Sequence, residues 1–189
     1  MREGINNCVV EGILSEIDLV ERSYERNGVM RDAIAGTIKV KVTETIEGEE
    51  KVLDVPVHFF SNALTNAGTP NPSYESLTRV MQDFKAIAAV GEENADRVRV
   101  TGANVAPNEY FGQDGRFISF PRVRGSFVSR VKPEDLQERA VWELELFIQD
   151  MKPITDDDGV ETGGLEITGI HVGYNERAEV IKVKTNDEK

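Results

Sequence analysis

Apolar and polar residues alternate along much of the first half of the chain, which is the pattern of half-buried β-strands. In the segment 33–45, Ile38, Val40 and Val42 fall on one face, while threonines and lysines fall on the other. Similar patterns predict strands at residues 7–19, 51–61 and 97–105 and, after a turn at 112–115, at 116–131. The chain is therefore predicted to be mainly β.

One segment instead repeats its apolar residues at helical spacing. The stripe begins at Tyr74, passes through Leu77 and Val80, and continues to Ala88. Ser73 is placed to cap this helix and Gly91 to end it. The stripe is predicted to face the core.

The predicted order is three strands, a helix and two further strands. This is the layout of the five-stranded Greek-key barrel of the oligonucleotide-binding (OB) fold, in which a helix lies between strands three and four. Gly12 interrupts the first strand, as a sharp bend in a small barrel requires. Phe59 and Phe60 are adjacent in the third strand, so they are predicted to point to opposite faces.

Two polar stretches separate the first three strands. Residues 21–32 are predicted to be a polar excursion with a turn at Asn27 and Gly28, and residues 47–50 are predicted to form a hairpin turn. Both would connect strands without adding to the core.

The C-terminal third contains three more predicted strands, at 141–151, 165–174 and 179–184. The sequence LEITGIHV at 165–172 weakly echoes LDVPVHFF at 53–60, yet no second helix follows. We predict an OB-fold domain at 1–112, followed at 113–189 by a β extension or an incomplete second OB-like domain.

Composition narrows the class of protein. The chain has 189 residues, 39% of them hydrophobic, with a single cysteine, Cys8, and two histidines. No internal disulfide is possible, and no apolar run predicts a membrane span or a secretory signal. The expected location is therefore a reducing cytoplasm.

Charge is distributed unevenly along the chain. The net charge is −12, of which residues 1–132 contribute −3 and residues 133–189 contribute −9. This balance argues against a protein that coats duplex DNA by charge alone, but it permits a local basic groove. The acidic third also suggests an alternative, an interaction module that contacts proteins or mimics nucleic acid.

Catalytic and metal-binding motifs are not found. The run Asp156–Gly159 lacks the alternating ligands and closing glutamate of a calcium loop. No phosphate-binding glycine loop is present, and His58 and His171 lie in separate strands without a nucleophile motif. We predict a protein that is not an enzyme and needs neither metal nor cofactor.

The segment 115–132 combines cations with aromatic rings and contains no carboxylate. Rings can stack on bases, and guanidinium groups can follow phosphates, so this ribbon suits a single nucleic-acid strand, DNA or RNA. Neighbouring sheet residues would share its face. The predicted binding residues are Lys39, Lys41, Phe60, Arg97, Arg99, Tyr110, Phe111, Arg116, Phe117, Phe120, Arg122, Arg124, Phe127 and Arg130.

A family resemblance rests on five segments: NNCVVEGIL at 6–14, VPVHFF at 55–60, the stretch 97–131, WELELFIQD at 142–150 and ETGGLEITGIHVGYN at 161–175. In these the chain resembles the single-stranded DNA-binding proteins of bacteriophages that infect Gram-positive hosts. The resemblance implies OB barrels that coat transient single strands during replication or recombination, and it implies no catalytic residue. The C-terminal TNDEK departs from the acidic, aromatic tip with which bacterial relatives recruit partner proteins.

Two hypotheses follow. In the first, the chain binds and protects single-stranded DNA, with replication or recombination proteins as further partners. In the second, the same barrel is an acidic protein-interaction module. Exposed strand edges would allow either to form a homo-oligomer.

Overall fold

The computed structural model describes residues 2–46, 48–173 and 176–185. The chain divides into two compact units, each described by itself: a barrel unit, residues 8–104 and 123–142, and a hairpin unit, residues 1–7, 105–122 and 143–189. The elements are β1 (Asn6–Arg26), β2 (Val29–Ile46), β3 (Glu49–Asn62), α1 (Pro72–Asp83), α2 (Ile87–Val90), the 3-10 turn η1 (Glu92–Asn94), β4 (Arg97–Phe111), β5 (Phe117–Arg124), β6 (Phe127–Arg130), the 3-10 turn η2 (Pro133–Asp135), β7 (Arg139–Leu144), β8 (Phe147–Thr155), β9 (Glu161–Val172) and β10 (Ala178–Lys184).

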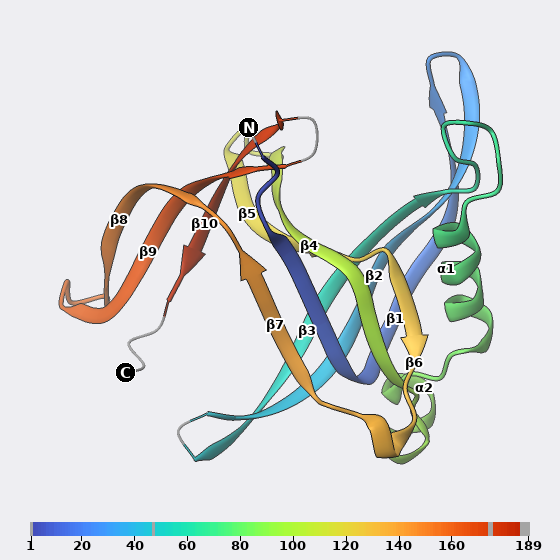
Figure 1. The fold of residues 1–189 in the computed structure, drawn as a ribbon, viewed down its shortest axis with the longest axis horizontal. Helices are drawn as coiled ribbons and strands as arrows, with labels where there is room; N and C mark the ends of the chain where they lie inside the picture. Colours follow the sequence, from blue (N-terminus) through green and yellow to red (C-terminus); the bar gives the residue numbers. More distant parts are fainter. Residues whose placement is uncertain (1, 47, 174–175, 186–189) are drawn as a thin grey trace. The chain divides into compact units, whose positions relative to one another are not determined.

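Five strands of the main sheet close a ring. β1 pairs with β2, β2 with β3, and β3 runs parallel to β5 where His58 meets Arg124. β5 neighbours β4, and β4 returns to pair antiparallel with β1. Because α1 lies between β3 and β4 in the chain (Figure 1), the predicted order of elements is confirmed. The protein is mainly β and has an OB-fold barrel with additional strands.

Gly12 lies where β1 changes its partner from β4 to β2. A Cβ atom at this position would lie 2.1 Å from the carbonyl oxygen of Lys41, so only glycine permits this close approach. A register shift between Leu14 and Glu16 follows directly. Gly12 therefore serves the bend that the sequence predicts.

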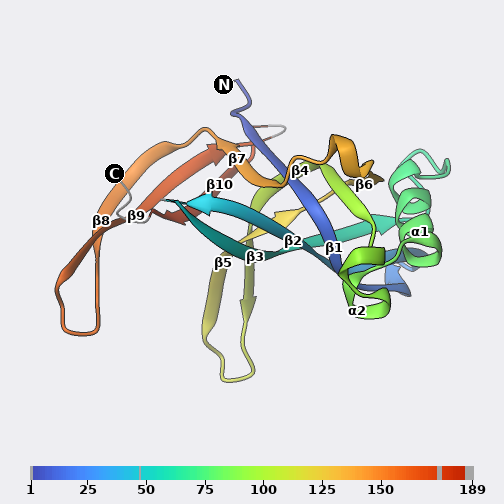
Figure 2. The same ribbon diagram turned by 90° about the horizontal axis from the view of Figure 1, so that it is seen from below.

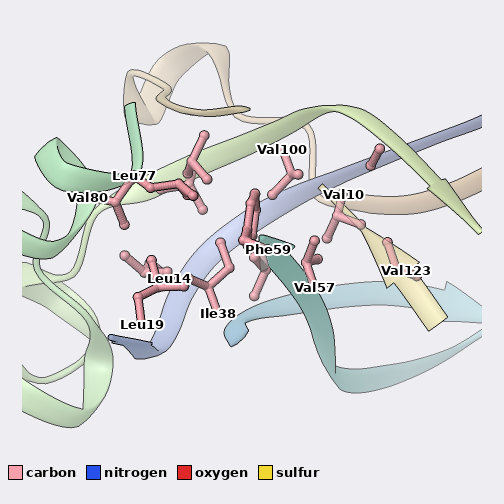
Figure 3. Close-up of a cluster of buried hydrophobic side chains, with 14 of the residues drawn as sticks. Val10, Leu14, Leu19, Ile38, Val57, Phe59, Leu77, Val80, Val100 and Val123 are labelled. Atoms are coloured by element: carbon pink, nitrogen blue, oxygen red, sulfur yellow. The ribbon is translucent and has the colours of Figure 1, made fainter. Parts of the chain in front are cut away.

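The alternating strand residues meet in one core within the barrel unit (Figure 3). Ile38, Val40 and Val42 are fully buried, as predicted, and Leu77 and Val80 of α1 join the same cluster. Its other labelled members are Val10, Leu14, Leu19, Val57, Phe59, Val100 and Val123. Phe59 is buried and Phe60 is exposed, which confirms their predicted opposite orientation.

The N-terminal cap of the helix differs from the prediction. Asn71 rather than Ser73 caps α1, because its Oδ1 accepts a hydrogen bond from the Ser73 N–H at 3.1 Å. Pro72 then occupies the first helical position, where its missing N–H costs nothing. The asparagine–proline pair, not the serine, was the stronger start signal.

The predicted helix is also interrupted. α1 ends at Asp83, and a separate single turn, α2, precedes Gly91. The break changes the phase of the apolar stripe, so Ala86 is buried and Ala88, which was predicted to face the core, is exposed. No described helix has the length and apolarity needed to cross a membrane.

Residues 21–32 form a paired β-hairpin arm, not the polar excursion that was predicted. β1 and β2 remain paired as far as Arg26 and Val29. Asn27 and Gly28 make the turn with φ of 54° and 75°, which confirms the predicted turn. Figure 1 shows this arm, in blue, projecting beyond α1. Polar side chains on both faces hid the strand from a hydrophobic pattern.

Two segments predicted as single strands are each divided in two. Residues 116–131 form β5 and β6, which are separated at Gly125. A Cβ atom on Gly125 would lie 2.6 Å from the Phe59 ring, so the chain passes the core at a point where no other side chain fits. Residues 141–151 likewise include the end of β7 and the start of β8.

β8, β9 and β10 form an antiparallel three-stranded sheet in the hairpin unit (Figure 2). β9 is the central strand, and within the described residues this sheet has two open edges rather than closing into a barrel. The additional strands predicted after the barrel are therefore present. The division into domains at 1–112 and 113–189 stays a prediction.

Some sequence predictions fall partly outside the described residues. Glu47 of the predicted 47–50 turn lies outside them, although Ile46 and Glu49 pair on either side. Tyr174 and Asn175 lie outside them, as do residues 186–189 of the C-terminal sequence.

Cys8 is buried in the barrel core, and its thiol forms a hydrogen bond with Trp142. Burial raises the pKa of the Cys8 thiol to about 11, although the bond with Trp142 acts in the opposite direction. Because the thiolate is the nucleophile, we expect the native protein to react very slowly with a disulfide reagent at about pH 8. Urea should restore the rate of an ordinary thiol. Equal rates in native and unfolded protein would contradict this placement.

Candidate nucleic-acid interface

The β4–β5 hairpin of the hairpin unit carries four of the predicted aromatic residues. Figure 2 shows it as a long two-stranded ribbon, which turns at Gly112 to Gly115 as predicted. Tyr110 faces Phe120 with ring centroids 6.3 Å apart, and Phe111 faces Phe117 at 5.5 Å. All four rings are exposed, Phe111 by 74% and Phe117 by 57%. They form two exposed cross-strand aromatic pairs.

Arginine side chains lie near these rings, and carboxylate side chains are also present on the hairpin. Arg122 places its guanidinium 5.9 Å from the centroid of the Phe120 ring. Arg116 forms an exposed ion pair with Asp114 at 3.3 Å, and Glu109 is hydrogen bonded to Ser119 on the neighbouring strand. Exposed ion pairs are weak, so Arg116 can exchange Asp114 for a phosphate at little cost.

The rest of the predicted ribbon belongs to the barrel unit. Arg124 and Phe127 are exposed there. Arg130 instead forms an ion pair with Asp96 at 3.0 Å and lies 4.1 Å from the Phe84 ring centroid. These contacts join β6 to the segment that follows α1, so Arg130 has a structural role whether or not it contacts a ligand.

The four cations predicted from the barrel strands all have protein partners. Lys39 pairs with Glu16 at 2.5 Å and Lys41 with Glu92 at 2.7 Å, and these contacts raise the pKa of both amines. Arg97 donates to backbone carbonyls, at 2.7 Å in the case of Ala95. Arg99 binds Glu11. Their role in binding stays a prediction.

Glu11 is the fully buried partner of Arg99. Arg99 donates from Nε at 2.8 Å and from Nη2 at 3.0 Å, and Arg139 approaches the same carboxylate at 3.4 Å. The backbone N–H of Gln137 donates to it as well. The hydrogen bonds from Arg99 hold the pKa of the Glu11 carboxyl below its ordinary value, although burial acts in the opposite direction. This network ties the segment before β7 to the barrel.

A second aromatic and basic surface, of which only Phe60 is predicted from the sequence, lies on and beside the β1–β2 arm of the barrel unit. Arg22, Tyr24 and Arg26 alternate along β1, so they share one face, and Arg31 lies opposite Tyr24 on β2. The Tyr24 ring lies 5.8 Å from Phe60, which is 58% exposed. We call these five residues the arm face.

The basic and acidic side chains of the arm lie on opposite faces of the β-hairpin. Among the residues that the structure describes, none of the three arm-face arginines forms an ion pair. Glu21 and Glu25 occupy alternate positions of β1 and therefore point to the other side, where Ser23 bonds Asp32. The signal in the sequence was the period-two spacing of Arg22, Tyr24 and Arg26 before an Asn-Gly turn.

The family model YorF matches residues 5–188. The chain belongs to the YorF family. No curated protein matches the sequence of this YorF-family chain.

A solved structure supports the fold of the YorF-family chain. The chain is similar to the crystal structure of a deletion mutant of the single-stranded DNA binding protein from Thermus aquaticus, with a TM-score of 0.52 and 15% sequence identity. The match covers 97% of this chain and 76% of that chain. At this identity the likeness concerns the fold, and function has to be argued from the surfaces.

Proposed function

We propose that this YorF-family chain binds and protects single-stranded DNA, without catalysing a reaction, during the replication or recombination of a bacteriophage genome. The observation that carries the proposal is the arm face, where three arginines and Tyr24 share one carboxylate-free side of a β-hairpin and the exposed Phe60 ring of β3 lies beside Tyr24. Rings stack on unpaired bases and guanidinium groups follow the phosphates.

The location of this surface supports the proposal. In OB-fold proteins the face of strands two and three, and the loops between strands one and two and between strands four and five, bind oligonucleotides. The arm connects β1 to β2, and the turn of the β4–β5 hairpin, which carries the exposed aromatic pairs, connects β4 to β5. The similar structure, by its title, is a single-stranded DNA binding protein.

The available contacts are sufficient for useful affinity. Stacking a base on an exposed ring contributes about 1 to 3 kcal/mol. The arm face offers Phe60, and the β4–β5 hairpin offers its two exposed aromatic pairs. On either surface, stacked bases together with several phosphate contacts would give useful affinity despite the acidic net charge of the chain.

Fluorescence anisotropy with labelled oligothymidine tests the proposal. We expect binding at micromolar protein or below, and a logarithmic affinity that falls with the logarithm of salt concentration by about 0.7 for each phosphate contact. A duplex of the same length should bind more weakly, because its bases cannot reach the rings. Binding that is absent at micromolar protein, or indifferent to salt, would reject the proposal.

A second candidate function is protein interaction through the acidic C-terminal third. The β8–β10 sheet exposes Phe147, Ile148 and Met151, and residues 133–189 carry a net charge of −9. Exposed apolar side chains in a chain segment of net negative charge suit a partner that is basic and partly apolar. Loss of DNA binding in the anisotropy assay, together with partner capture that survives nuclease treatment, would favour this function over the first.

A further inference from the structure

The two aromatic pairs of the β4–β5 hairpin lie on opposite faces of the ribbon. Tyr110 and Phe111 are neighbours in β4, so their side chains point to opposite sides. The Phe120 ring contacts Tyr110 on one side. The Phe117 ring contacts Phe111 on the other. A nucleic-acid strand laid along one face therefore contacts one pair and leaves the second pair uncovered.

The two faces also differ in charge. The Tyr110 face carries the guanidinium of Arg122 beside its rings, which suits a phosphate backbone. Glu109 lies two residues before Phe111 in β4 and therefore shares its face, where the carboxylate would repel phosphates. Phe111 and Phe117 are nevertheless the most exposed of the four rings. This pair suits a partner other than DNA.

An apolar pocket of about 480 Å³ opens on the β8–β10 sheet of the same unit. Phe147 of β8 pairs with Ile170 of β9, and both line the pocket. Val172, two residues further along β9, pairs with Ala178 of β10, so these four apolar residues share one face of the sheet. Glu176 is an acidic residue of the lining. Pockets of about 300 to 1,000 Å³ receive small organic ligands, so an aromatic ring has room here.

We propose that the hairpin tip of one copy of this chain, formed by Phe111, Arg116 and Phe117, inserts into this pocket of a second copy. A phenylalanine ring would lie against Phe147, with Arg116 near Glu176. The contact joins two different surfaces, so each copy keeps a tip or a pocket for the next one, and copies can follow one another in an open row. The inference goes beyond the proposed function, because two copies can meet without DNA.

Charge favours a second copy as the occupant. Residues 115–132 hold five cations and no carboxylate, whereas residues 133–189 carry a net charge of −9. The hairpin and the C-terminal sheet thus come from segments of opposite sign, which favours their association. Arg116 is held only by an exposed ion pair with Asp114, so it can approach Glu176 at little cost.

The size of the contact predicts a weak association. A phenylalanine side chain buries about 150 to 250 Å², so a contact built on two rings is small and typical of transient interfaces. We expect a dissociation constant of roughly tens to hundreds of micromolar. Copies that neighbour each other on one bound strand would meet at a high effective concentration, where such a contact becomes populated.

Sedimentation velocity of the full chain without DNA tests the contact. We expect the average sedimentation coefficient to rise as the protein concentration increases from about 10 to about 300 µM. Phe111→Ser with Phe117→Ser removes the tip, and Ala178→Lys fills the pocket and repels Arg116. Each variant should weaken self-association at least about tenfold. Circular dichroism should be unchanged, since all three substituted residues are exposed.

Mixing the two variants shows whether a tip meets a pocket. The tip variant keeps its pocket and the pocket variant keeps its tip, so the mixture should form a one-to-one dimer that grows no further. Such a dimer would also show that both variants fold. A mixture that stays monomeric would overturn the inference, as would a wild-type chain that stays monomeric at about 300 µM.

Tyr110→Ser with Phe120→Ser is the matched control, because it removes two rings from the opposite face of the same hairpin. Self-association should persist in this variant. A loss equal to that of the tip variant would mean general aromatic adhesion and would overturn the inference. Oligothymidine binding by a chain that never self-associates would reject this inference alone. Self-association without oligothymidine binding would reject only the proposed function.

Discussion

Replacing Glu11 with alanine is expected to destabilise the protein by about 3 kcal/mol, measured as the free energy of unfolding in urea. The carboxylate is fully buried, and its loss leaves Arg99, Arg139 and the Gln137 N–H without their acceptor. We place the effect at the lower end of the range for broken buried ion pairs. The reason is that the side chains of Arg99 and Arg139 remain 38% and 41% exposed, so water can solvate them in the variant.

Glu16→Ala is the matched control for this prediction. Glu16 lies on the same strand and pairs with Lys39, but both side chains are close to half exposed. Its loss should therefore cost less than about 1 kcal/mol. Similar costs for the two variants would show that the Glu11 network does not hold the barrel.

The pH dependence of stability gives a second measurement of the same network. The pKa of Glu11 is lower in the folded state than in the unfolded state. Its contribution to stability is therefore complete above the unfolded value of about 4.3 and is lost as the pH falls toward the lowered folded value. Glu11→Gln should flatten this part of the acid unfolding profile relative to wild type.

Replacing Arg22 and Arg26 together with glutamate is expected to weaken oligothymidine binding at least about tenfold at roughly 0.1 M salt. The change reverses the side-chain charge at both arginine positions on β1, on either side of Tyr24 in the arm face. The slope of logarithmic affinity against logarithmic salt should fall by about 1.4, because each lost phosphate contact removes about 0.7. Circular dichroism should be unchanged, since both side chains are exposed and belong to no described ion pair.

Arg79→Glu combined with Lys85→Glu is the control for net charge. Both residues are exposed, on α1 and just after it, and the double change alters the charge of the chain by the same amount. If binding depends on the arm face, this variant should keep most of its affinity and its salt slope. Equal losses in both double variants would mean that long-range charge, not local contact, governs binding.

The core could be predicted from the sequence because burial imposes a period on the chain. In any β-strand, Ile38, Val40 and Val42 must point to the same face. The adjacent Phe59 and Phe60 must point to opposite faces, irrespective of which strand lies beside them. The Asn27-Gly28 turn was predictable for a similar reason, since few residues tolerate positive φ. In the arm, polar residues on both faces conceal the alternation, so a hydrophobic pattern does not predict these strands.

The candidate site was predictable only in part. The sequence identified the aromatic residues of the β4–β5 hairpin as candidates, and the structure leaves them exposed. It could not show that Arg99 binds a buried glutamate 88 positions away, or that Arg130 is held by Asp96 and Phe84. Such partners are set by the closing of the barrel, which brings together strands that are distant in the chain.

The sequence by itself determined the strand order, the buried faces and the place of the helix, because local spacing and turn chemistry act between neighbours. Only the tertiary structure decided which cations remain unpaired, that Tyr24 meets Phe60, and that Phe147 lines an open apolar pocket. Those outcomes depend on ring closure and on the exact register of pairing, and a single register step would carry every one of these side chains to the other face.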